Sequence, residues 1–557
     1  MEYVIFGIVI GALLVLLFIK GSVDEKKRLK RQFEIMKNEY GKLPLNTYEG
    51  DELCVIKSYF ERKRGPESID DITAGDLELD EIFKRINYSR SSIGASVLYH
   101  ILRTPEKSGE KLETLEKKIT YFEDNEADRL KIREYYNRLG KLKVSMFDCL
   151  DCIESLDRAS LFIDYLSILL LVSGLVCICI VPAWGVFMLI LAVSVNIISY
   201  YSKRGRIEPY IISFGYINHF ILMAKNITAI KNDCLKDEYE CISENAERLK
   251  DFTKHAGLVL NNNSSKIGAG NPFELLLDYV KMLLHVDIIY FYKMLDVMKK
   301  NIDAVESLYY NLGLIESYID IAYFRASLSG KCVPVYGKGL RLEEAYHPLI
   351  EEPVKNSVET DGGVLITGSN ASGKSTFLKT VALNVLFAQT IHTCTADSYC
   401  GEPLTLFSSM ALRDNLSGND SYFMVEIKAM KRILDYMEAN PGIRVICFVD
   451  EVLRGTNTVE RIAASTEILK HLMEKCCIVF AATHDGELTD TLKDRYVNYH
   501  FEEEIKDGDV LFNYRLQNGK ATTRNAIKLL SVMGFPKELV DSAEGASAKF
   551  LDKGVWL

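Results

Sequence analysis

The sequence lacks an excess of positive charge. Its 557 residues include 67 Lys or Arg against 77 Asp or Glu, which gives a net charge of −10 at pH 7. This balance argues against a protein whose whole surface is cationic and coats DNA. It is compatible with a basic groove confined to one part of the surface. With 48% hydrophobic and 26% charged residues, the composition indicates an ordered chain of several domain-sized units.

The cysteines lack a repeated spacing. Thirteen are scattered along the chain, and several lie in apolar runs such as "LVCICIV". This pattern argues against a disulfide framework and predicts reduced, buried thiols. Cys149 and Cys152 form a CxxC pair, but no second pair follows at metal-ligand spacing. The pair therefore favours ordinary helix packing over a zinc or redox site.

Charged residues are absent from the run between Tyr3 and Ile19. A secretory signal would carry positive charge before its apolar run and a small-residue cleavage site after it, and this segment has neither. We expect a retained membrane anchor whose C-terminal side is cytoplasmic, because basic residues concentrate on that side of membrane spans. The basic residues that follow the run are Lys26, Lys27, Arg28, Lys30 and Arg31.

A second uncharged stretch extends from Tyr165 to Tyr201, which is too long for one membrane pass and suits two. Pro182 lies near its middle and predicts a tight turn at "VPAWG" on the far side, with Trp184 at the interface. We expect Asn196 to make a helix–helix hydrogen bond rather than a transport site. A buried hairpin in a soluble core is the alternative, although such cores seldom need so long a run without one charge. The basic residues that would return the chain to the cytoplasm are Lys203, Arg204 and Arg206.

The rest of the first 340 residues contains little glycine or proline. Amphipathic spacing, for example in "NPFELLLDYVKMLLHVDIIYFYKML", predicts mostly α-helices with aromatic residues in the core. After "YHPLIEEP" the pattern changes to short β-branched runs that alternate with helices: "GVLITG", "RVICFVD" and "CIVFAATH". This alternation predicts a parallel α/β sheet, whose ligand sites lie at the carboxyl ends of the strands.

The first of these strand ends carries a phosphate-binding motif. Gly368, Gly373, Lys374 and Ser375 satisfy GxxxxGK[ST] between a strand and a helix. The glycines let backbone N–H groups surround an anion, and the helix N-terminus adds positive potential. The lysine reaches the β- and γ-phosphates, and the serine hydroxyl is a ligand for Mg²⁺.

Two further strand ends carry acidic and basic side chains. In "VICFVDEVLRGTNT", Asp450 is expected to hold Mg²⁺ and Glu451 to act as general base on the attacking water. In "VFAATHDGEL", His484 is placed to sense the γ-phosphate, the alternative being a histidine in a solvated loop. Together with the phosphate motif, these residues predict Mg²⁺-dependent hydrolysis of ATP.

These motifs, in this order, resemble the ATPase domain of the MutS mismatch-recognition family. "TGSNASGKST" resembles that family's TGPNxxGKST, "DEVLRGTNT" its DExxRGTxT, "ATHDGEL" its ATHxxEL, and "SYFMVEI" its STFMVEM. The resemblance extends to "YHPLI" and to the closing segment "NYRLQNGKATTRNAIKLLSVMGFPKELVDSA". It is weaker in the helical half, where "LELDEIFKRINYSRSSIGASVLYHIL" resembles the start of the lever and core region.

The resemblance implies an ABC-type ATPase that forms a homodimer, in which each site is completed by a signature segment of the other protomer. Asn419 and Asp420 stand where the family usually has Gly-Arg, which weakens the expected contact in trans. The resemblance assigns catalysis to Glu451, His484 and Lys374, and Mg²⁺ binding to Ser375 and Asp450. It assigns ATP binding to Gly368, Asn370, Gly373, Lys374, Ser375 and Thr376, and to Ser421 in trans.

Two features depart from the family. The sequence shows no mismatch-binding segment with a Phe-x-Glu wedge, and the three expected membrane passes are foreign to soluble mismatch-repair proteins. The expected fold is an α/β P-loop ATPase domain of the ABC type after an all-α lever and core region with three transmembrane helices. The expected parts are an anchor at 1–20, a cytoplasmic helical region at 21–160, a transmembrane hairpin at 161–202, a helical core and lever at 203–340, and the ATPase domain at 341–557.

Together with the resemblance, the sequence predicts an ATP-hydrolysing, dimeric, MutS-like switch, and the resemblance associates it with DNA mismatch repair. We expect it to be an integral protein of the cell membrane with a cytoplasmic ATPase domain. Double-stranded DNA and an unidentified protein are candidate partners. The alternatives are a membrane ATPase similar to ABC transporters and an ATP-regulated membrane scaffold, neither with a role on DNA.

Overall fold

The computed structural model describes residues 20, 23–24, 26–48, 50–157, 160–260, 279–369, 372–410, 422–453, 456–475, 478–506, 509–521, 527, 530–531 and 533–553. The chain forms two compact units, each assembled from separated segments. The helical unit comprises Met1–Lys63, Asn87–His100 and Lys117–Tyr323, and the sheet unit comprises Arg64–Ile86, Ile101–Glu116 and Phe324–Leu557. The region expected as one part at 21–160 is thus divided between the two units.

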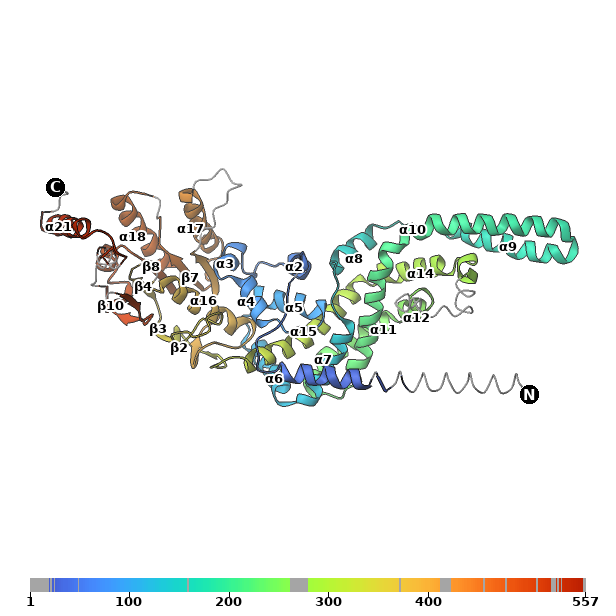
Figure 1. Ribbon diagram of the computed structural model, residues 1–557, viewed down its shortest axis with the longest axis horizontal. Helices are drawn as coiled ribbons and strands as arrows, with labels where there is room; N and C mark the ends of the chain where they lie inside the picture. Colours follow the sequence, from blue (N-terminus) through green and yellow to red (C-terminus); the bar gives the residue numbers. More distant parts are fainter. Residues whose placement is uncertain are drawn as a thin grey trace. The chain divides into compact units, whose positions relative to one another are not determined.

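The helical unit contains only helices among its described elements (Figure 1). Phe214 lies at its centre, with ring centroids 5.4 Å from Phe252 and 5.1 Å from Phe291, and all three side chains are fully buried. These rings join three helices into one core, as the amphipathic spacing predicted. The helices are α2 (Glu52–Lys63), α7 (Glu126–Leu139), α8 (Met146–Ser155), α9 (Phe162–Ile180), α10 (Pro182–Thr228), η1 (Asp233–Leu235), α11 (Lys236–Arg248), α12 (Lys250–Val259) and α14 (Val286–Lys300). Helices α5 (Ser92–Arg103), α6 (Gly109–Asp124) and α15 (Ile302–Ala326) contribute residues to both units.

Helices α9 and α10 form a hairpin that turns at Val181. Gly185 is required at the turn, because a Cβ atom there would lie 2.3 Å from the backbone nitrogen of Ile178. Among the described residues, these two helices are long and apolar enough to cross a membrane, and only 17% of the most apolar window of each is buried. The expected anchor between Tyr3 and Ile19 lies outside the described residues.

The second helix of the hairpin is longer than the predicted span at 161–202. Helix α10 does not end near Lys203 but continues through Pro209 to Thr228, so it joins the apolar hairpin to the helical core. Its last part is held by tertiary packing, since Phe214, Ile217, Phe220 and Ala224 are fully buried. This burial outweighs the hydrogen bond that a proline removes from a helix interior.

The sheet unit is built on a six-stranded sheet in the order β12-β9-β4-β8-β7-β6. Strands β9, β4, β8, β7 and β6 are parallel, and β12 pairs antiparallel with β9. The three apolar runs expected to form a parallel sheet are β4, β8 and β7, and all of their residues are buried. The strand bounds are β4 (Gly363–Thr367), β6 (Thr405–Ser409), β7 (Val445–Asp450), β8 (Ile478–Thr483), β9 (Tyr496–His500) and β12 (Gln517–Asn518).

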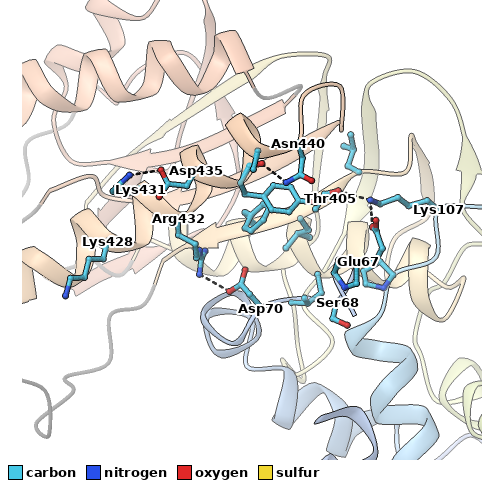
Figure 2. A pocket seen from close by; sticks show the side chains of 18 residues that line it. Glu67, Ser68, Asp70, Lys107, Thr405, Lys428, Lys431, Arg432, Asp435 and Asn440 are labelled. Atoms are coloured by element: carbon cyan, nitrogen blue, oxygen red, sulfur yellow. Dashed lines mark hydrogen bonds and ion pairs between the residues drawn. The ribbon is translucent and has the colours of Figure 1, made fainter. Parts of the chain in front are cut away.

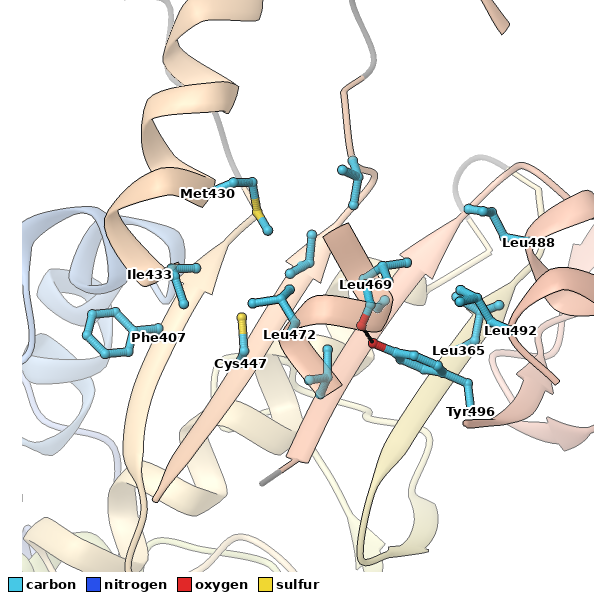
Figure 3. Packing of buried hydrophobic residues seen from close by; sticks show 14 of the residues in the cluster. Leu365, Phe407, Met430, Ile433, Cys447, Leu469, Leu472, Leu488, Leu492 and Tyr496 are labelled. Carbon is cyan, nitrogen blue, oxygen red and sulfur yellow. Dashed lines mark hydrogen bonds between the residues drawn. The ribbon is translucent and has the colours of Figure 1, made fainter. Parts of the chain in front are cut away.

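One face of this sheet packs against α17 (Tyr422–Ala439) and α18 (Thr458–Lys475), as Figure 3 shows. Alternate strand residues such as Leu365, Cys447 and Val479 meet Ile433 and Leu472 there. A hydrogen bond of 2.8 Å from the Tyr496 hydroxyl to the Leu469 carbonyl ties β9 to α18. Helix α16 (Lys374–Thr390), which contacts β8, β7 and β6, is buried along nearly its whole length.

A second sheet has the order β1-β5-β2-β3. Its strands are β1 (Val335–Tyr336), β2 (Leu340–Ala345), β3 (Asn356–Thr360) and β5 (Ser398–Gly401), and β10 (Glu503–Lys506) pairs with β11 (Asp509–Phe512) in a separate ribbon. The remaining helices of the unit are α3 (Asp71–Asp76), α4 (Leu79–Ile86), α19 (Glu487–Thr491) and α21 (Lys537–Lys553).

Helix α3 covers the outer edge of β6. The Ser408 N–H donates to the Thr73 hydroxyl at 3.2 Å, and the Met410 N–H donates to the Asp76 carboxylate at 2.9 Å. An uncovered edge strand offers unpaired N–H and C=O groups to other chains, and these contacts occupy two of them. This is why residues 64–86, far from β6 in sequence, belong to the sheet unit.

Candidate functional site

Two positions between β4 and α16 have a backbone conformation that only glycine adopts easily. Gly368 has φ 144° and Gly373 has φ 105°, both in the region that L side chains rarely occupy. A Cβ atom on Gly368 would lie 2.7 Å from the Phe501 carbonyl oxygen, and one on Gly373 would lie 3.2 Å from the Tyr514 ring. The turn therefore needs glycine at both positions, as the phosphate motif predicted.

Lys374 begins α16 and points its ammonium back over this turn. Its Nζ donates to the carbonyl oxygens of Gly368 at 2.8 Å and Ser369 at 2.7 Å, and lies 3.5 Å from His484 Nδ1. The side chain is only 5% exposed. A nearly buried cation at a helix N-terminus, held over a glycine turn, creates a strong preference for an anion at that place.

Ser375 and Asp450 meet although 75 residues separate them. The Ser375 hydroxyl donates to Asp450 Oδ2, and the Asp450 side chain is buried at the end of β7. The strand pairing brings them together, because β4 and β7 both pair in parallel with β8 and all three strands end at the same edge.

This oxygen pair fits a magnesium ion. Mg²⁺ prefers oxygen ligands and usually takes one or two from protein side chains, completing its shell with phosphate oxygens and water. A hydroxyl and a carboxylate in mutual contact supply those two. Among the described residues, no group of three or more His, Cys, Asp and Glu side chains is placed to hold a metal ion. This statement also applies to the surroundings of Cys149 and Cys152.

Glu451 and His484 lie at the same edge of the sheet. His484 Nε2 is 2.5 Å from Glu451 Oε1, and the Glu451 N–H donates to the Ala482 carbonyl at 2.9 Å. Glu451 and Leu453 have φ 55° and 58°, so the chain leaves β7 through two residues in the left-handed region. Such conformations cost roughly 1–3 kcal/mol each and concentrate at functional sites. The turn directs the carboxylate of Glu451 toward His484.

Two residues outside the predicted set hold the loop that carries His484. Arg461, on α18, forms a two-point ion pair with Asp485, with N–O distances of 2.9 and 2.7 Å. Both residues line a cavity of about 200 Å³ together with Glu451 and His484. Asp485 lies within the quoted "ATHDGEL", but the sequence carried no signal that its partner is Arg461.

A cavity of about 360 Å³ adjoins the glycine turn on its other side. Phe377 and Phe501 meet edge to face there, with ring centroids 5.9 Å apart. Burial lowers the pKa of His347, which belongs to the quoted "YHPLI", to about 4, and the nearby Lys379 adds to this effect. His347 is therefore neutral at pH 7. The cavity lining consists of Ala345, His347, Ile350, Glu352, Pro353, Val354, Asn356, Gly373, Thr376, Phe377, Thr380, Phe501 and Tyr514.

The site thus collects most of the residues predicted for it. Lys374, Ser375, Asp450, Glu451 and His484 lie around the glycine turn, and Thr376 lines the adjoining cavity. Asn370 and Ser421 lie outside the described residues. The sequence analysis missed Glu503, a nearly buried carboxylate that accepts a hydrogen bond of 2.8 Å from Ser369, because 134 residues separate the two.

A larger cavity of about 720 Å³ lies elsewhere in the sheet unit, against β6 and α17 (Figure 2). Four of its charged side chains form two pairs: Arg432 with Asp70 at 2.8 Å, and Lys107 with Glu67 at 2.5 Å. Lys107 also donates to the Thr405 hydroxyl at 2.9 Å. No residue predicted to bind a nucleotide lines this cavity, so the phosphate site is separate from it.

Comparison with known proteins finds similarity over the region that carries the site. Residues 364–551 match the family model for MutS domain V. The chain is 34% identical over 218 residues to the DNA mismatch repair protein MutS of Thermus thermophilus, covering 38% of this chain and 26% of that protein. It is 32% identical over 224 residues to the DNA mismatch repair protein MutS of Chloroflexus aurantiacus, covering 38% and 23%.

The similarity to a third relative covers more of the chain. The chain is 27% identical over 340 residues to MutS protein homolog 4 of Mus musculus, covering 58% of this chain and 34% of that protein. The matched part spans about a quarter to a third of the length of these curated relatives. The comparisons support the resemblance to the MutS family, and the matched residues 364–551 include the glycine turn, Lys374, Ser375, Asp450, Glu451 and His484.

Proposed function

We propose that the sheet unit binds ATP with Mg²⁺ and hydrolyses it, as the motor of a MutS-like switch. The observation that carries this proposal is the position of Lys374, whose ammonium is held by two carbonyl groups over a glycine turn beside Ser375, Asp450 and His484. The carbonyl oxygens of Gly368 and Ser369 accept hydrogen bonds from the Lys374 ammonium, and the phosphate oxygens of a bound triphosphate would replace them as acceptors.

The residues divide the work by their chemistry. Lys374 and the backbone N–H groups at the start of α16 bind the β- and γ-phosphates. The cavity beside Gly373 and Thr376 suits the adenine ring of ATP. Phe377, Phe501 and Tyr514 line it, and flat aromatic and apolar side chains stack against a nucleobase. Ser375 and Asp450 hold Mg²⁺, which when bound neutralises phosphate charge in the transition state.

Glu451 is the general base in this proposal. Its carboxylate lies at the carboxyl end of β7, next to Asp450, where it can accept a proton from the attacking water. His484 is a positioning residue: Nε2 holds the Glu451 carboxylate while Nδ1 faces Lys374. A γ-phosphate bound at Lys374 would reach the histidine as well, which couples the base to the presence of ATP.

The similarity to MutS proteins supports a homodimer in which Ser421 of one protomer completes the site of the other. It also makes double-stranded DNA a candidate partner, because the relatives from Thermus and Chloroflexus are named as DNA mismatch repair proteins. A mobility-shift titration with duplex DNA over a range of salt tests this part. Contacts with DNA phosphates require the affinity for DNA to fall as the salt concentration rises. The absence of any mobility shift at low salt would exclude DNA as a partner and favour a membrane ATPase without a role on DNA.

We propose in addition that hairpin α9–α10 anchors the chain in a membrane. The supporting observation is its exposed apolar surface, which includes Phe162, Leu169, Ile180, Trp184, Phe187, Ile190 and Ile198. The core helices of a soluble protein are mostly buried, whereas these are not. Asn196 donates to the Ser167 carbonyl at 3.2 Å, the helix–helix hydrogen bond expected for it.

Opposite the turn of the hairpin, an ion pair joins α9 to α10, and a histidine outside the hairpin contacts the same carboxylate. Asp164, in the first turn of α9, lies 2.5 Å from Lys203 Nζ and 2.7 Å from His285 Nδ1. These contacts hold the start of α9 beside Lys203 of α10, and charged groups at this place suit the polar boundary of a bilayer. Flotation of the full chain with phospholipid vesicles tests the anchor, and a chain that stays at the bottom of the gradient without detergent would contradict it.

Equilibrium binding of a fluorescent ATP analogue tests the nucleotide site independently of DNA and membrane. We expect saturable, Mg²⁺-dependent binding by the detergent-solubilised full chain and its loss in Lys374→Ala. Equal binding by both proteins would contradict the assignment of the glycine turn.

A further inference from the structure

We propose that a pocket at the charged end of the hairpin binds the headgroup of a zwitterionic phospholipid that carries a primary ammonium group. The inference rests on the membrane attachment proposed above and names the lipid chemistry that the hairpin selects. The pocket has a volume of about 460 Å³ and lies within the helical unit. Its lining consists of Tyr200, Tyr201, Arg204, Gly205, Glu208, Tyr279 and Met282.

The position of the pocket along α10 matches the headgroup layer. The helix from Pro182 to Tyr201 rises about 30 Å, which equals the thickness of the hydrocarbon core of a bilayer. The residues that follow Tyr201 therefore lie at the boundary with water. Tyr201 and Tyr279 are 65% and 55% exposed, as expected for tyrosines that stand among lipid headgroups.

The α10 residues of the lining share one face of the helix. Tyr201, Arg204, Gly205 and Glu208 are spaced at three and four residues, so these residues lie on the same face of the helix. Gly205 leaves open space in the middle of this face, because a Cβ atom added there would have no neighbouring atom within 4 Å. The face has a cation and an anion on either side of the opening left by the glycine.

Arg204 is suited to the lipid phosphate. One of its N–H groups donates to Asp287 at 3.2 Å, and the Tyr200 hydroxyl donates to the same carboxylate at 3.1 Å. Asp287 thus holds the guanidinium in place while using one of its five N–H donors. The rest of the planar group can form a two-point contact with a phosphate, which arginine makes more readily than lysine.

Glu208 and Gly205 supply the acceptors for an ammonium group. Glu208 is exposed and forms no ion pair with any residue in the described part of the chain. Pro209 has no N–H, so the Gly205 carbonyl, four residues before it, lacks the donor that a regular helix would give it. Near a bilayer an unsatisfied carbonyl is costly, and a primary ammonium with three N–H donors can serve both oxygens.

This combination selects among the common headgroups. A trimethylammonium group has no N–H to donate, so it would leave the Gly205 carbonyl unserved. An anionic headgroup without an amine would meet Arg204 favourably but would face Glu208 with a like charge. A phosphatidylethanolamine headgroup matches each of the groups, while its acyl chains continue along the exposed apolar surface of α9 and α10.

Native mass spectrometry of the detergent-solubilised full chain tests the proposal. The chain is titrated with phosphatidylethanolamine, phosphatidylcholine and phosphatidylglycerol of identical acyl chains. We expect phosphatidylethanolamine to bind about tenfold more tightly than phosphatidylcholine, the effect of one hydrogen bond to a charged group. Glu208→Gln should abolish this preference, and Gly205→Leu should weaken binding of the lipid by filling the pocket.

Two matched variants serve as controls. Arg206→Gln removes a cation of α10 that does not line the pocket, and Gly215→Leu adds a side chain at another α10 glycine with open space around it. Both should bind phosphatidylethanolamine like the wild type. Because Arg204→Gln would also disturb Asp287, the test depends on Glu208, whose replacement breaks no ion pair within the described residues.

Equal binding of phosphatidylethanolamine and phosphatidylcholine, a preference for phosphatidylglycerol, or an unaltered preference in Glu208→Gln would each overturn the proposal. Displacement of the lipid by glycerophosphoethanolamine at equal concentration would also overturn it, because the ligand would then be a water-soluble solute. Vesicle flotation of the same proteins tests the membrane anchor separately from the headgroup pocket. A wild-type chain that floats without headgroup preference contradicts only the pocket, whereas one that never floats contradicts the membrane anchor.

Discussion

His484 Nε2 lies 2.5 Å from Glu451 Oε1, and Nδ1 of the same ring lies 3.5 Å from Lys374 Nζ. One imidazole therefore spans the distance between the proposed base and the cation proposed to hold the phosphates. The pairing of Asp450 with Ala482 sets this arrangement, because it places the residues after β7 and β8 side by side.

Replacement of Glu451 by glutamine should separate hydrolysis from binding. The amide keeps the size of the carboxylate but cannot accept the proton, so turnover should fall by about 10²–10⁴-fold while nucleotide affinity is kept. Phosphate release and fluorescent nucleotide binding measure the two quantities. Glu467→Gln, on the exposed face of α18, is the matched control, and a Glu451→Gln protein with wild-type turnover would exclude this carboxylate as the base.

Asp450→Asn should raise the Mg²⁺ concentration needed for half-maximal activity by about tenfold or more, because a charged ligand becomes a neutral one. Activity measured against Mg²⁺ concentration at fixed ATP gives this value. Asp435→Asn, which removes an exposed carboxylate of α17 paired with Lys431, should leave the curve in place. The same curve for wild type and Asp450→Asn would show that Asp450 does not hold the ion.

Gly368→Ala should destabilise the sheet unit. The new Cβ atom would lie 2.7 Å from the Phe501 carbonyl oxygen on a backbone with φ 144°, at a cost of about 1–3 kcal/mol or more. Thermal unfolding should therefore start at a lower temperature than in Gly65→Ala, where an added Cβ meets nothing within 4 Å. Equal unfolding midpoints for the two variants would mean that the turn adapts to a side chain.

Stability should fall as the pH is lowered from 6.5 toward 4. Burial lowers the pKa of His347 from 6.5 to about 4, so in this window the unfolded chain binds a proton that the folded chain does not. The loss amounts to about 3 kcal/mol at the acid end of the window, and the full contribution is present above pH 6.5. His347→Gln should reduce the slope of unfolding midpoint against pH.

The slope should not vanish in that variant. Burial likewise lowers the pKa of His100 to about 4, and this histidine stays in place. A slope that is identical in wild type and His347→Gln would mean that His347 is protonated in the folded chain.

The local features of the site were predictable from the sequence, because strand, glycine turn and helix follow one another without interruption between Gly363 and Thr390. The meeting of Ser375, Asp450 and His484 also followed, since parallel strands end at one edge of a sheet. The contact of Ser369 with Glu503 did not follow, because no sequence pattern links residues 134 positions apart.

The sequence was less informative about the ends of helices. Lys203, Arg204 and Arg206 predicted the end of the membrane span, whereas α10 continues past them to Thr228, since burial of Phe214 and Phe220 favours the helix more than Pro209 opposes it. Residues 64–86 gave no sign that α3 would cover β6, because that contact depends on hydrogen bonds that backbone N–H groups of one edge strand donate to Thr73 and Asp76.

Hydrolysis of ATP by the purified full chain, compared with Lys374→Ala, is the decisive test of the proposed nucleotide site. The control is Lys470→Ala, which removes a cation from the exposed face of α18. We expect Mg²⁺-dependent phosphate release by the wild type and the control, and none above background by Lys374→Ala. Equal phosphate release by all three proteins, or by none of them, would contradict it.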